Sequence, residues 1–382
     1  MLAFLLARRG VEVTLLEAHG DFDRDFRGDT IHPATLELLD QLGLADRLLE
    51  LPHSKVQTVS LPGPRGRLTL ADLKHLRTRF PYVALMAQSR LLDFMAAEGA
   101  RFPTFDLRMH ANVQELIEEG GVVRGVRYRD PNGVQELRAP LTVAADGRFS
   151  KVRHLAGMQP VGTSPPMDVL WFRLPRRPDE PSGGLGAFGS RGRLAILLER
   201  GDQWQVAYVI HKGAYQQLHA AGIDELRSQI AEVLPQLADR AGQLTDWRQV
   251  SLLSVESSRL RRWYKPGVLF IGDAAHVMSP VGGVGINYAI QDAVVAANIL
   301  AEPLKRGAVS TAQLRAVQRR CELPVRFIQS LQAFVQLRIV AGALDATRPL
   351  RLPVFVRWPG FRSLAPRVIG YGLWPPKIAN PG

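Results

Sequence analysis

One stretch of this sequence, residues 269–287, restricts the possible fold more than any other. It begins with Leu-Phe-Ile-Gly-Asp-Ala-Ala-His at the end of an apolar, strand-like run, and continues through Pro280 and several glycines into a long helical stretch. A carboxylate at a strand end, here Asp273, accepts hydrogen bonds from ribose or ribityl hydroxyls. Glycines at a helix N-terminus let backbone amides approach an anion or a heteroaromatic ring. The stretch therefore predicts one edge of a nucleotide site in an α/β protein.

Two further acidic residues stand at the ends of strand-like stretches. Asp146 and Gly147 follow one such stretch and precede Arg153. A single Asp-Gly pair ordinarily marks a turn, but here it complements the Gly-Asp pair at 272–273. Glu17 ends another strand-like stretch, and an acid in that position accepts a hydrogen bond from an adenosine ribose in dinucleotide-binding folds. The alternative interpretation of Glu17 is a solvated acid at a strand end.

Strands and helices alternate through much of the chain. The pattern predicts helices at 2–9, 34–42, 89–97, 224–234 and 285–300, with a further helix from 311. It predicts strands at 11–17, 109–116, 122–128, 135–137, 141–145, 169–174, 194–199, 205–210 and 268–271. The strands between 165 and 253 are separated by Gly, Pro and Ser, which is typical of an antiparallel sheet inserted into a helix-covered one.

The two motifs together resemble a known family. Residues 269–287 are similar to the second flavin motif of the para-hydroxybenzoate hydroxylase family, the single-component group A flavoprotein monooxygenases, and 143–153 are similar to its middle motif. The resemblance implies an α/β fold: a Rossmann-like FAD-binding domain, an inserted and mainly antiparallel β-sheet substrate domain, and a C-terminal helical tail. We assign the FAD-binding domain to 1–65, 86–164 and 254–305, the substrate domain to 66–85 and 165–253, and the tail to 306–382.

The resemblance also implies roles for individual residues around the FAD. Asp273 would hold the ribityl chain and the pyrophosphate region. Asp146 would contact the pyrophosphate and support NAD(P)H binding, while Arg153 braces its turn. Pro280 would lie near the flavin ring, and the residues after it would present backbone to the pyrimidine edge. The complete set of cofactor-binding residues that the resemblance implies is Glu17, Arg27, Gln88, Val113, Asp146, Gly147, Arg153, Asp273, Pro280, Gly282, Gly283, Gly285, Ile286 and Asn287.

The start of the sequence departs from the family pattern. The family opens with a strand and a Gly-x-Gly-x-x-Gly loop ahead of the helix that is expected here from residue 2, and neither precedes that helix in this sequence. Loss of an anion contact at a helix N-terminus costs at most about 2 kcal/mol. Loss of an interior strand removes hydrogen-bond partners from both neighbouring strands. We therefore expect either a misassigned start or a weakened FAD site.

The activity that the resemblance implies is FAD-dependent monooxygenation. NAD(P)H would reduce the FAD, the reduced flavin would react with O2, and one oxygen atom would pass to an aromatic or polycyclic small molecule. Two alternatives stay open: another flavin-dependent reaction on the same fold, such as halogenation or reduction, and an inactive, truncated member of the family. Flavin halogenases would carry a Trp-x-Trp-x-Ile-Pro signature, which this sequence lacks. The motifs require no catalytic side chain, and we predict none.

Composition limits the classes of partner, other than the flavin and the substrate, that we expect this chain to bind. The 48 basic and 36 acidic residues give a formal charge of +12, which either attracts anionic partners or reflects an Arg-rich genome. The basic residues are spread along the chain without a nucleic-acid-binding motif, so we expect no nucleic acid. The single cysteine, Cys321, allows no disulfide framework, which favours the cytoplasm. No His pair has metal spacing, so we expect no metal.

Neither end of the chain predicts a membrane contact. The apolar residues 1–7 precede Arg8 and Arg9, the reverse of the order in a secretory signal, and no stretch approaches the ~20 apolar residues of a membrane span. Trp358 and Trp374 lie among arginines, but prolines in this tail interrupt any long amphipathic helix. We therefore expect no transmembrane segment, and we keep a peripheral membrane contact of the tail only as the less favoured alternative.

Three further features have ordinary structural interpretations. Residues 184–189 read Gly-Leu-Gly-Ala-Phe-Gly, a literal match to the dinucleotide fingerprint, but they precede a strand instead of a helix. We interpret them as a glycine-rich turn in the substrate domain. His32 and His276 have no acidic partner that the sequence identifies, so we interpret them as hydrogen-bonded structural histidines rather than proton carriers.

Overall fold

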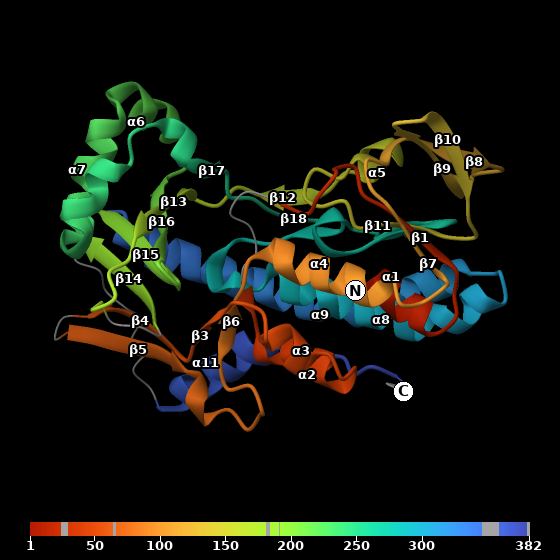
Figure 1. Cartoon of the computed structure of the whole chain (residues 1–382), viewed down its shortest axis with the longest axis horizontal. Helices are drawn as coiled ribbons and strands as arrows, with labels where there is room; N and C mark the ends of the chain where they lie inside the picture. Colours follow the sequence, from red (N-terminus) through yellow and green to blue (C-terminus); the bar gives the residue numbers. More distant parts are fainter. Residues whose placement is uncertain (24–29, 64–65, 181–183, 191, 346–358, 380–382) are drawn as a thin grey trace.

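The computed structural model describes residues 1–23, 30–63, 66–180, 184–190, 192–345 and 359–379. Two long helices, α8 (Gly285–Lys305) and α9 (Thr311–Val335), run side by side through the middle of the molecule (Figure 1). A seven-stranded sheet lies at one end and a three-stranded antiparallel sheet at the other. This arrangement confirms the predicted α/β class with a separate, mainly antiparallel sheet.

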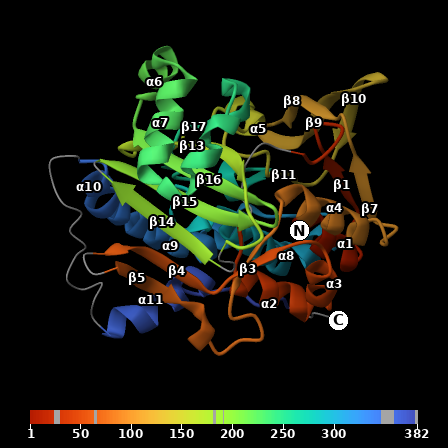
Figure 2. The same cartoon turned by 60° about the vertical axis from the view of Figure 1, so that its left-hand side comes forward.

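Short parallel strands beside the two helices carry the predicted motifs. β11 (Thr142–Ala144) pairs in parallel with β20 (Val268–Phe270), whose other edge pairs with β19 (Tyr264–Lys265). β1 (Val13–Leu16) pairs in parallel with β7 (Phe105–Arg108). β1 lies near β11 in both views (Figures 1 and 2), but among the described residues no strand joins the two groups, so they form separate sheets.

Four helices from the N-terminal part of the chain pack together beside α8: α1 (Leu2–Arg8), α2 (Pro33–Gln41), α3 (Ala45–Leu49) and α4 (Gln88–Gly99). Phe4 and Leu5 of α1 belong to the same buried cluster as Val294 of α8. Gly10 and Gly43, which follow α1 and α2, have φ of +75° and +70°, a conformation that glycine adopts without steric cost. Both helices end within one residue of the ends predicted from the sequence.

Nine other short strands form three small sheets. Among the described residues, the first sheet contains β8 (Asn112–Glu119), β9 (Val122–Asp130) and β10 (Gly133–Arg138). The second contains β2 (Thr30–Ile31), β6 (Val83–Leu85) and β3 (Ser54–Val56). The third contains β12 (Val161–Thr163), β18 (Ser257–Arg259) and β21 (His276–Val277). The strand predicted at 109–116 begins later than expected, at Asn112. His110 has a φ of +56°, which separates β7 from β8.

The seven-stranded sheet has the order β17-β13-β16-β15-β14-β4-β5. Its strands are β17 (Ser251–Leu253), β13 (Met167–Pro175), β16 (Gln203–His211), β15 (Arg193–Arg200), β14 (Gly184–Ser190), β4 (Thr58–Gly63) and β5 (Gly66–Asp72). Helices α6 (Tyr215–Ala221) and α7 (Ile223–Val233) cover one face (Figure 2). On that face Leu170 and Phe172 pack with Leu226 and Ile230.

One prediction about this sheet is wrong. Residues 184–189 are not a turn but most of β14, which pairs with β15 from Leu185 to Ser190 and in parallel with β4 from Gly184 to Gly186. Backbone pairing on both edges outweighs the low strand preference of glycine. β4, which precedes residue 66, pairs with β14 and β5 in this sheet. The domain division stays a prediction.

The helical path of α9 continues without a break as far as Ala343. A π-helical turn, Gln336–Val340, joins α9 to α10 (Ala341–Ala343), and α11 (Pro359–Tyr371) packs near β5. One helical stretch, Val281–Lys305, is long and apolar enough to cross a membrane, which the sequence analysis overlooked because polar residues interrupt it. Of its most apolar window, 67% is buried inside the protein, the environment of a core helix.

Candidate functional site

The pairing of β11 with β20 brings the two predicted acidic turns to one edge of a sheet. The strands run parallel, so the residues that follow them, Asp146 and Asp273, leave at the same end. The Ile271 amide donates to the Ala144 carbonyl at 3.0 Å and extends the pairing to the start of both turns. In open α/β sheets, ligands bind at this carboxyl end of the strands.

Arg153 joins the two turns directly. One guanidinium nitrogen donates to the carbonyls of Asp273 (3.3 Å) and Ala274 (3.0 Å), and the other donates to the carbonyl of Arg148 (2.7 Å). A guanidinium has five donors in a fixed planar fork, so it can satisfy carbonyls of two chain segments at once. Arg153 therefore fixes the position of one turn relative to the other.

The Asp146 carboxylate organises its own turn. It accepts a hydrogen bond from the Ser150 hydroxyl and another from the Val152 amide at 3.0 Å. Ser150 in turn caps α5 (Lys151–Leu155) by accepting from the Arg153 amide. Gly147 has a φ of +83°, a conformation that other residues rarely adopt. Asp146 itself is exposed at the edge, where a ligand can reach it.

The predicted loop between β21 and α8 has the geometry that its glycines suggested. Gly282 and Gly283 have φ of +83° and +62°. A Cβ on Gly283 would lie 2.7 Å from the Thr30 hydroxyl oxygen, and that hydroxyl donates to the Gly283 carbonyl at 2.6 Å. Only glycine allows this close approach. Pro280 opens the loop, and Gly285 and Ile286 begin α8, whose N-terminus carries free amides toward the same edge.

Asn287 is fully occupied in holding this loop. Its side-chain oxygen accepts from the His32 amide (2.9 Å) and the Thr35 hydroxyl (2.7 Å). Its side-chain nitrogen donates to the carbonyls of Thr30 (3.1 Å) and Gly283 (3.4 Å). The Asn287 side chain therefore binds protein, which leaves only its backbone for a ligand.

The remaining predicted residues lie on other elements. Glu17 follows β1, and its carboxylate accepts from the His19 amide at 3.0 Å. Gln88 is the first residue of α4, and Val113 is a half-buried residue of β8. Arg27 lies outside the described residues. The structure thus brings 146–153 and 272–287 into contact, and it leaves Glu17 on the separate β1–β7 sheet.

A buried acid–histidine pair behind the Gly-Asp turn escaped the sequence analysis. His276 Nε2 lies 2.6 Å from an oxygen of Asp292, and the same oxygen accepts from the Gly272 amide at 2.9 Å. His276 and Asp292 are each 1% exposed. The acidic partner that the sequence did not identify for His276 is therefore Asp292. Asp292 lies in α8, beyond the glycine loop in the sequence, and only the folded chain brings its side chain next to His276.

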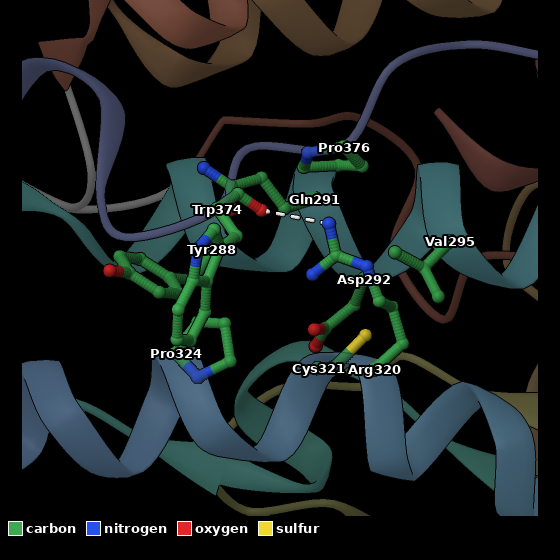
Figure 3. Close-up of a pocket in the computed structure, with 9 residues that line it drawn as sticks. All are labelled: Tyr288, Gln291, Asp292, Val295, Arg320, Cys321, Pro324, Trp374 and Pro376. Carbon is green, nitrogen blue, oxygen red and sulfur yellow. Dashed lines mark hydrogen bonds between the residues drawn. The ribbon is translucent and has the colours of Figure 1, made fainter.

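Cys321 of α9 contacts the other side of this pair. Burial, with the neighbouring Asp292 carboxylate, raises the pKa of its thiol well above the ordinary value. Figure 3 shows Asp292 facing Cys321 and Arg320 across the space between α8 and α9. The Arg320 guanidinium donates to the Trp374 carbonyl at 3.1 Å. These two residues help to line the small pocket into which Asp292 and Cys321 also face. Such a thiol is a packing residue, not a nucleophile.

His32 is a structural histidine, as the sequence analysis predicted. It is 2% exposed, and its Nδ1 lies 2.7 Å from the Ile369 carbonyl of α11. Burial lowers the pKa of His32 to about 4, although hydrogen bonds to backbone carbonyls oppose the shift. The ring is therefore neutral near pH 7.

The comparisons with known proteins agree with this geometry. A family model described as the FAD binding domain matches residues 1–329. This chain belongs to that FAD-binding family. A relative, 6-methylpretetramide 4-monooxygenase of Streptomyces rimosus, is 36% identical, and the match covers 97% of this chain and 89% of the relative. The chain is accordingly a FAD-dependent monooxygenase that uses NAD(P)H.

Solved structures of other enzymes show the same fold. The p-nitrophenol 4-monooxygenase of Pseudomonas putida DLL-E4 superposes with a TM-score of 0.76 at 21% identity, covering 96% of this chain and 90% of the other. A flavin-dependent brominase superposes with a TM-score of 0.76 at 15% identity, covering 97% and 89%. At these identities the likeness concerns the fold alone, and the brominase shows that the fold also serves halogenation.

The residues of this flavoprotein fit an extended dinucleotide. At Gly285 a Cβ would meet no atom within 4 Å, and this open space, the amides at the start of α8, and the adjacent ends of β11 and β20 are suited to the backbone-lined edge of such a site. Asp273 is half-buried at this edge, beside the carbonyls that Arg153 binds. Among the described residues, no group of three or more His, Cys, Asp or Glu side chains is placed to hold a metal ion.

Proposed function

We propose that this chain hydroxylates a polycyclic aromatic compound related to 6-methylpretetramide. The observation that carries the proposal is the 36% identity to 6-methylpretetramide 4-monooxygenase along nearly the whole of both chains. Other relatives support the same substrate class, including an anhydrotetracycline monooxygenase that is 28% identical over 77% of this chain and 58% of its own length. Halogenation is the second reaction that the fold allows, but no residue of this chain favours it.

We propose that the FAD lies along the edge formed by β11, β20 and α8. Asp273 would accept from the ribityl chain, Asp146 would face the pyrophosphate region, and the backbone at 285–287 would meet the pyrimidine edge of the ring. The Arg153 bridge and the glycine conformations support this assignment, because they hold both turns in place without a ligand. Glu17, Gln88, Val113 and Arg27 complete the proposed set.

The substrate would lie against the face of the seven-stranded sheet opposite α6 and α7, beside the residues that Val340 and Leu344 cover. Trp171 and Ile196 on this face pack in one cluster with Val281 of the glycine loop, so the face adjoins the proposed flavin ring. The cluster is apolar, which suits a multi-ring compound. The Trp171 indole N–H is buried and has no hydrogen-bond partner among the described residues. A substrate oxygen that accepted from it would remove the cost of that unpaired donor.

FAD, when bound, supplies the hydride acceptance and the oxygen activation. The chain's own residues bind and orient. Arg153 and Asp146 hold the turn at the pyrophosphate, and the loop from Pro280 to Gly283 presents backbone to the ring. The apolar wall at Trp171 and Ile196 excludes water from the reacting atoms. We assign no catalytic side chain.

The test uses purified full chain with FAD, NAD(P)H and 6-methylpretetramide in air containing 18O2. The proposal predicts a product heavier than the substrate by one oxygen atom, labelled from 18O2, with one NAD(P)H consumed for each product. A brominated product in the presence of bromide would replace hydroxylation by halogenation. NAD(P)H consumption that yields only hydrogen peroxide would refute this substrate class.

A further inference from the structure

Three buried glutamines at the C-terminal end of α9 contact the region of the loop between β21 and α8. We call this loop, residues 278–284, the flavin loop. Gln329 donates to the carbonyls of Val277 and Ser258, each at 3.0 Å. Gln332 donates to the carbonyls of Ser279 and Val281, each at 2.8 Å, and the amide of Gln336 donates to the Ser279 hydroxyl. The three side chains are 6%, 2% and 3% exposed, respectively. Spacings of three and four residues place them on one face of the helix.

Two of these contacts fall on backbone outside the strands. Ser279 and Val281 lie between β21 and α8, so their carbonyls join no strand ladder, and Gln332 supplies a donor to each. A buried carbonyl without a donor is costly, and each glutamine here supplies a donor from outside the loop. The position of this loop therefore depends on the position of α9.

The same helix reaches the substrate sheet. Gln336 begins the π-helical turn, and π turns often occur at functional sites. Beyond it, Val340 and Leu344 pack in one cluster with Val169 and Val209 of β13 and β16. His211 of β16 lies with its Nε2 3.2 Å from the Leu344 carbonyl. One continuous helical segment thus binds the flavin loop at Gln332 and the substrate sheet at Val340 and Leu344.

We propose that Gln332 and Gln336 are positioning residues, which set the flavin loop at a fixed distance from the substrate sheet and thereby determine coupling. In a coupled turnover, substrate, O2, NAD(P)H and a proton give hydroxylated product, NAD(P)+ and water. In an uncoupled turnover, O2, NAD(P)H and a proton give hydrogen peroxide and NAD(P)+. A displaced loop would shift the ring relative to the substrate wall, so that the second outcome gains at the expense of the first. The proposal rests on the FAD site described above.

The test compares Gln332→Met and Gln336→Met with a matched control, Gln318→Met. Methionine keeps the length and most of the volume of glutamine but donates no hydrogen bond. Gln318 is also buried on α9, at 8% exposure, but it bonds to the Trp263 amide and the Arg261 carbonyl, away from the loop. Both Gln332→Met and Gln336→Met are made, so that either alone decides if the other does not fold.

The first readout is hydrogen exchange of the peptide covering 277–284 in protein without added FAD. We expect exchange to rise roughly five- to tenfold in Gln332→Met, less in Gln336→Met, and not in Gln318→Met. Unchanged exchange in Gln332→Met, or an equal rise in all three variants, would overturn the proposal. Because this readout needs no flavin, it separates failure of this inference from failure of the proposed function, which a colourless wild-type protein would reveal.

The second readout is the ratio of hydroxylated product to NAD(P)H consumed, with 6-methylpretetramide as the probe. We expect this ratio to fall severalfold in Gln332→Met, with a matching rise in hydrogen peroxide and an unchanged rate of NAD(P)H oxidation. The ratio should stay at the wild-type value in Gln318→Met. An equal loss of NAD(P)H oxidation and product, with the ratio unchanged, would show a structural role only and would contradict the proposal.

Discussion

The edge formed by β11 and β20 and the edge formed by β1 and β7 are held very differently. Behind the first, side chains from three elements converge: the half-buried Arg153 bridges two turns, and the buried Asp292 and Gln332 bind Gly272, His276 and the loop. The second is a two-stranded sheet whose Leu15 is 37% exposed. Arg108 there donates to the Asp106 carboxylate and the Tyr128 hydroxyl, with 43% of its own side chain exposed.

The difference indicates which half of the proposed cofactor site is held in place before FAD binds. The proposed flavin-ring and pyrophosphate half is held by hydrogen bonds that are buried or partly buried, so water competes with them poorly. The proposed adenosine half, at Glu17, is carried by the two-stranded β1–β7 sheet and by side chains that water can reach. We therefore expect changes on the first side to affect stability and FAD affinity far more than matched changes on the second.

The largest contrast is expected between two acids. Asp292→Ala should lower the free energy of unfolding by about 3–5 kcal/mol, because it leaves His276 and the Gly272 amide buried without their acceptor. Asp106→Ala, at a carboxylate with 48% of its side chain exposed, should change it by less than about 0.5 kcal/mol. Urea denaturation measures both variants. Similar values for the two would break the comparison.

The second prediction concerns pH and His32, which adjoins the braced loop through Asn287. Because burial lowers the pKa of His32 to about 4, the unfolded chain takes up the proton first as the pH falls below about 6.5. The stabilising effect of the neutral ring is complete above that pH and is lost as the pH falls toward 4. Between pH 7 and pH 4.5, wild type should lose about 2–3 kcal/mol more unfolding free energy than His32→Gln. Equal pH dependence in the two proteins would be the contrary result.

The third prediction uses two arginines. Arg153→Met removes donors from the Arg148, Asp273 and Ala274 carbonyls and should weaken FAD binding about tenfold to a hundredfold, since charge-assisted hydrogen bonds contribute about 1.5–3 kcal/mol. Arg108→Met, on the β7 side, should weaken it less than about threefold. Quenching of FAD fluorescence gives both dissociation constants. A larger effect from Arg108→Met would reverse the assignment of the two halves.

The smallest effect is expected at Glu17. Glu17→Gln keeps an acceptor for the His19 amide but removes the charge, so the free energy of unfolding should change by less than about 0.5 kcal/mol. FAD affinity should fall a few-fold, because a carboxylate is the stronger acceptor for a ribose hydroxyl. Titration with FAD checks this against riboflavin, which lacks the adenosine ribose. An equal loss for both ligands would remove Glu17 from the adenosine end.

The sequence was sufficient for the parts of the site that depend on local backbone chemistry. Asp146, Gly147 and Gly283 were identified because an acid at a strand end and glycines in a left-handed conformation leave a recognisable pattern in neighbouring residues. The α/β class followed from the same strand–turn–helix units, and most helices lie within a few residues of their predicted bounds.

The supporting side chains could not be predicted in this way. Asp292 and Gln332 are polar residues inside ordinary helices, and only tertiary packing gives them partners. β14 was misread because its glycines match a turn, whereas backbone pairing on both edges decided the structure. Long-range contacts of this kind leave no signal in local spacing.

The most direct test of the account is hydrogen exchange of the wild-type chain with and without FAD. If the turns after β11 and β20 enclose one cofactor, peptides covering 144–153 and 271–287 should become protected together, at the same FAD concentration. Peptides from the β13–β16 region should change little. Protection confined to the β13–β16 region, or no protection at either turn while FAD binds, would contradict it.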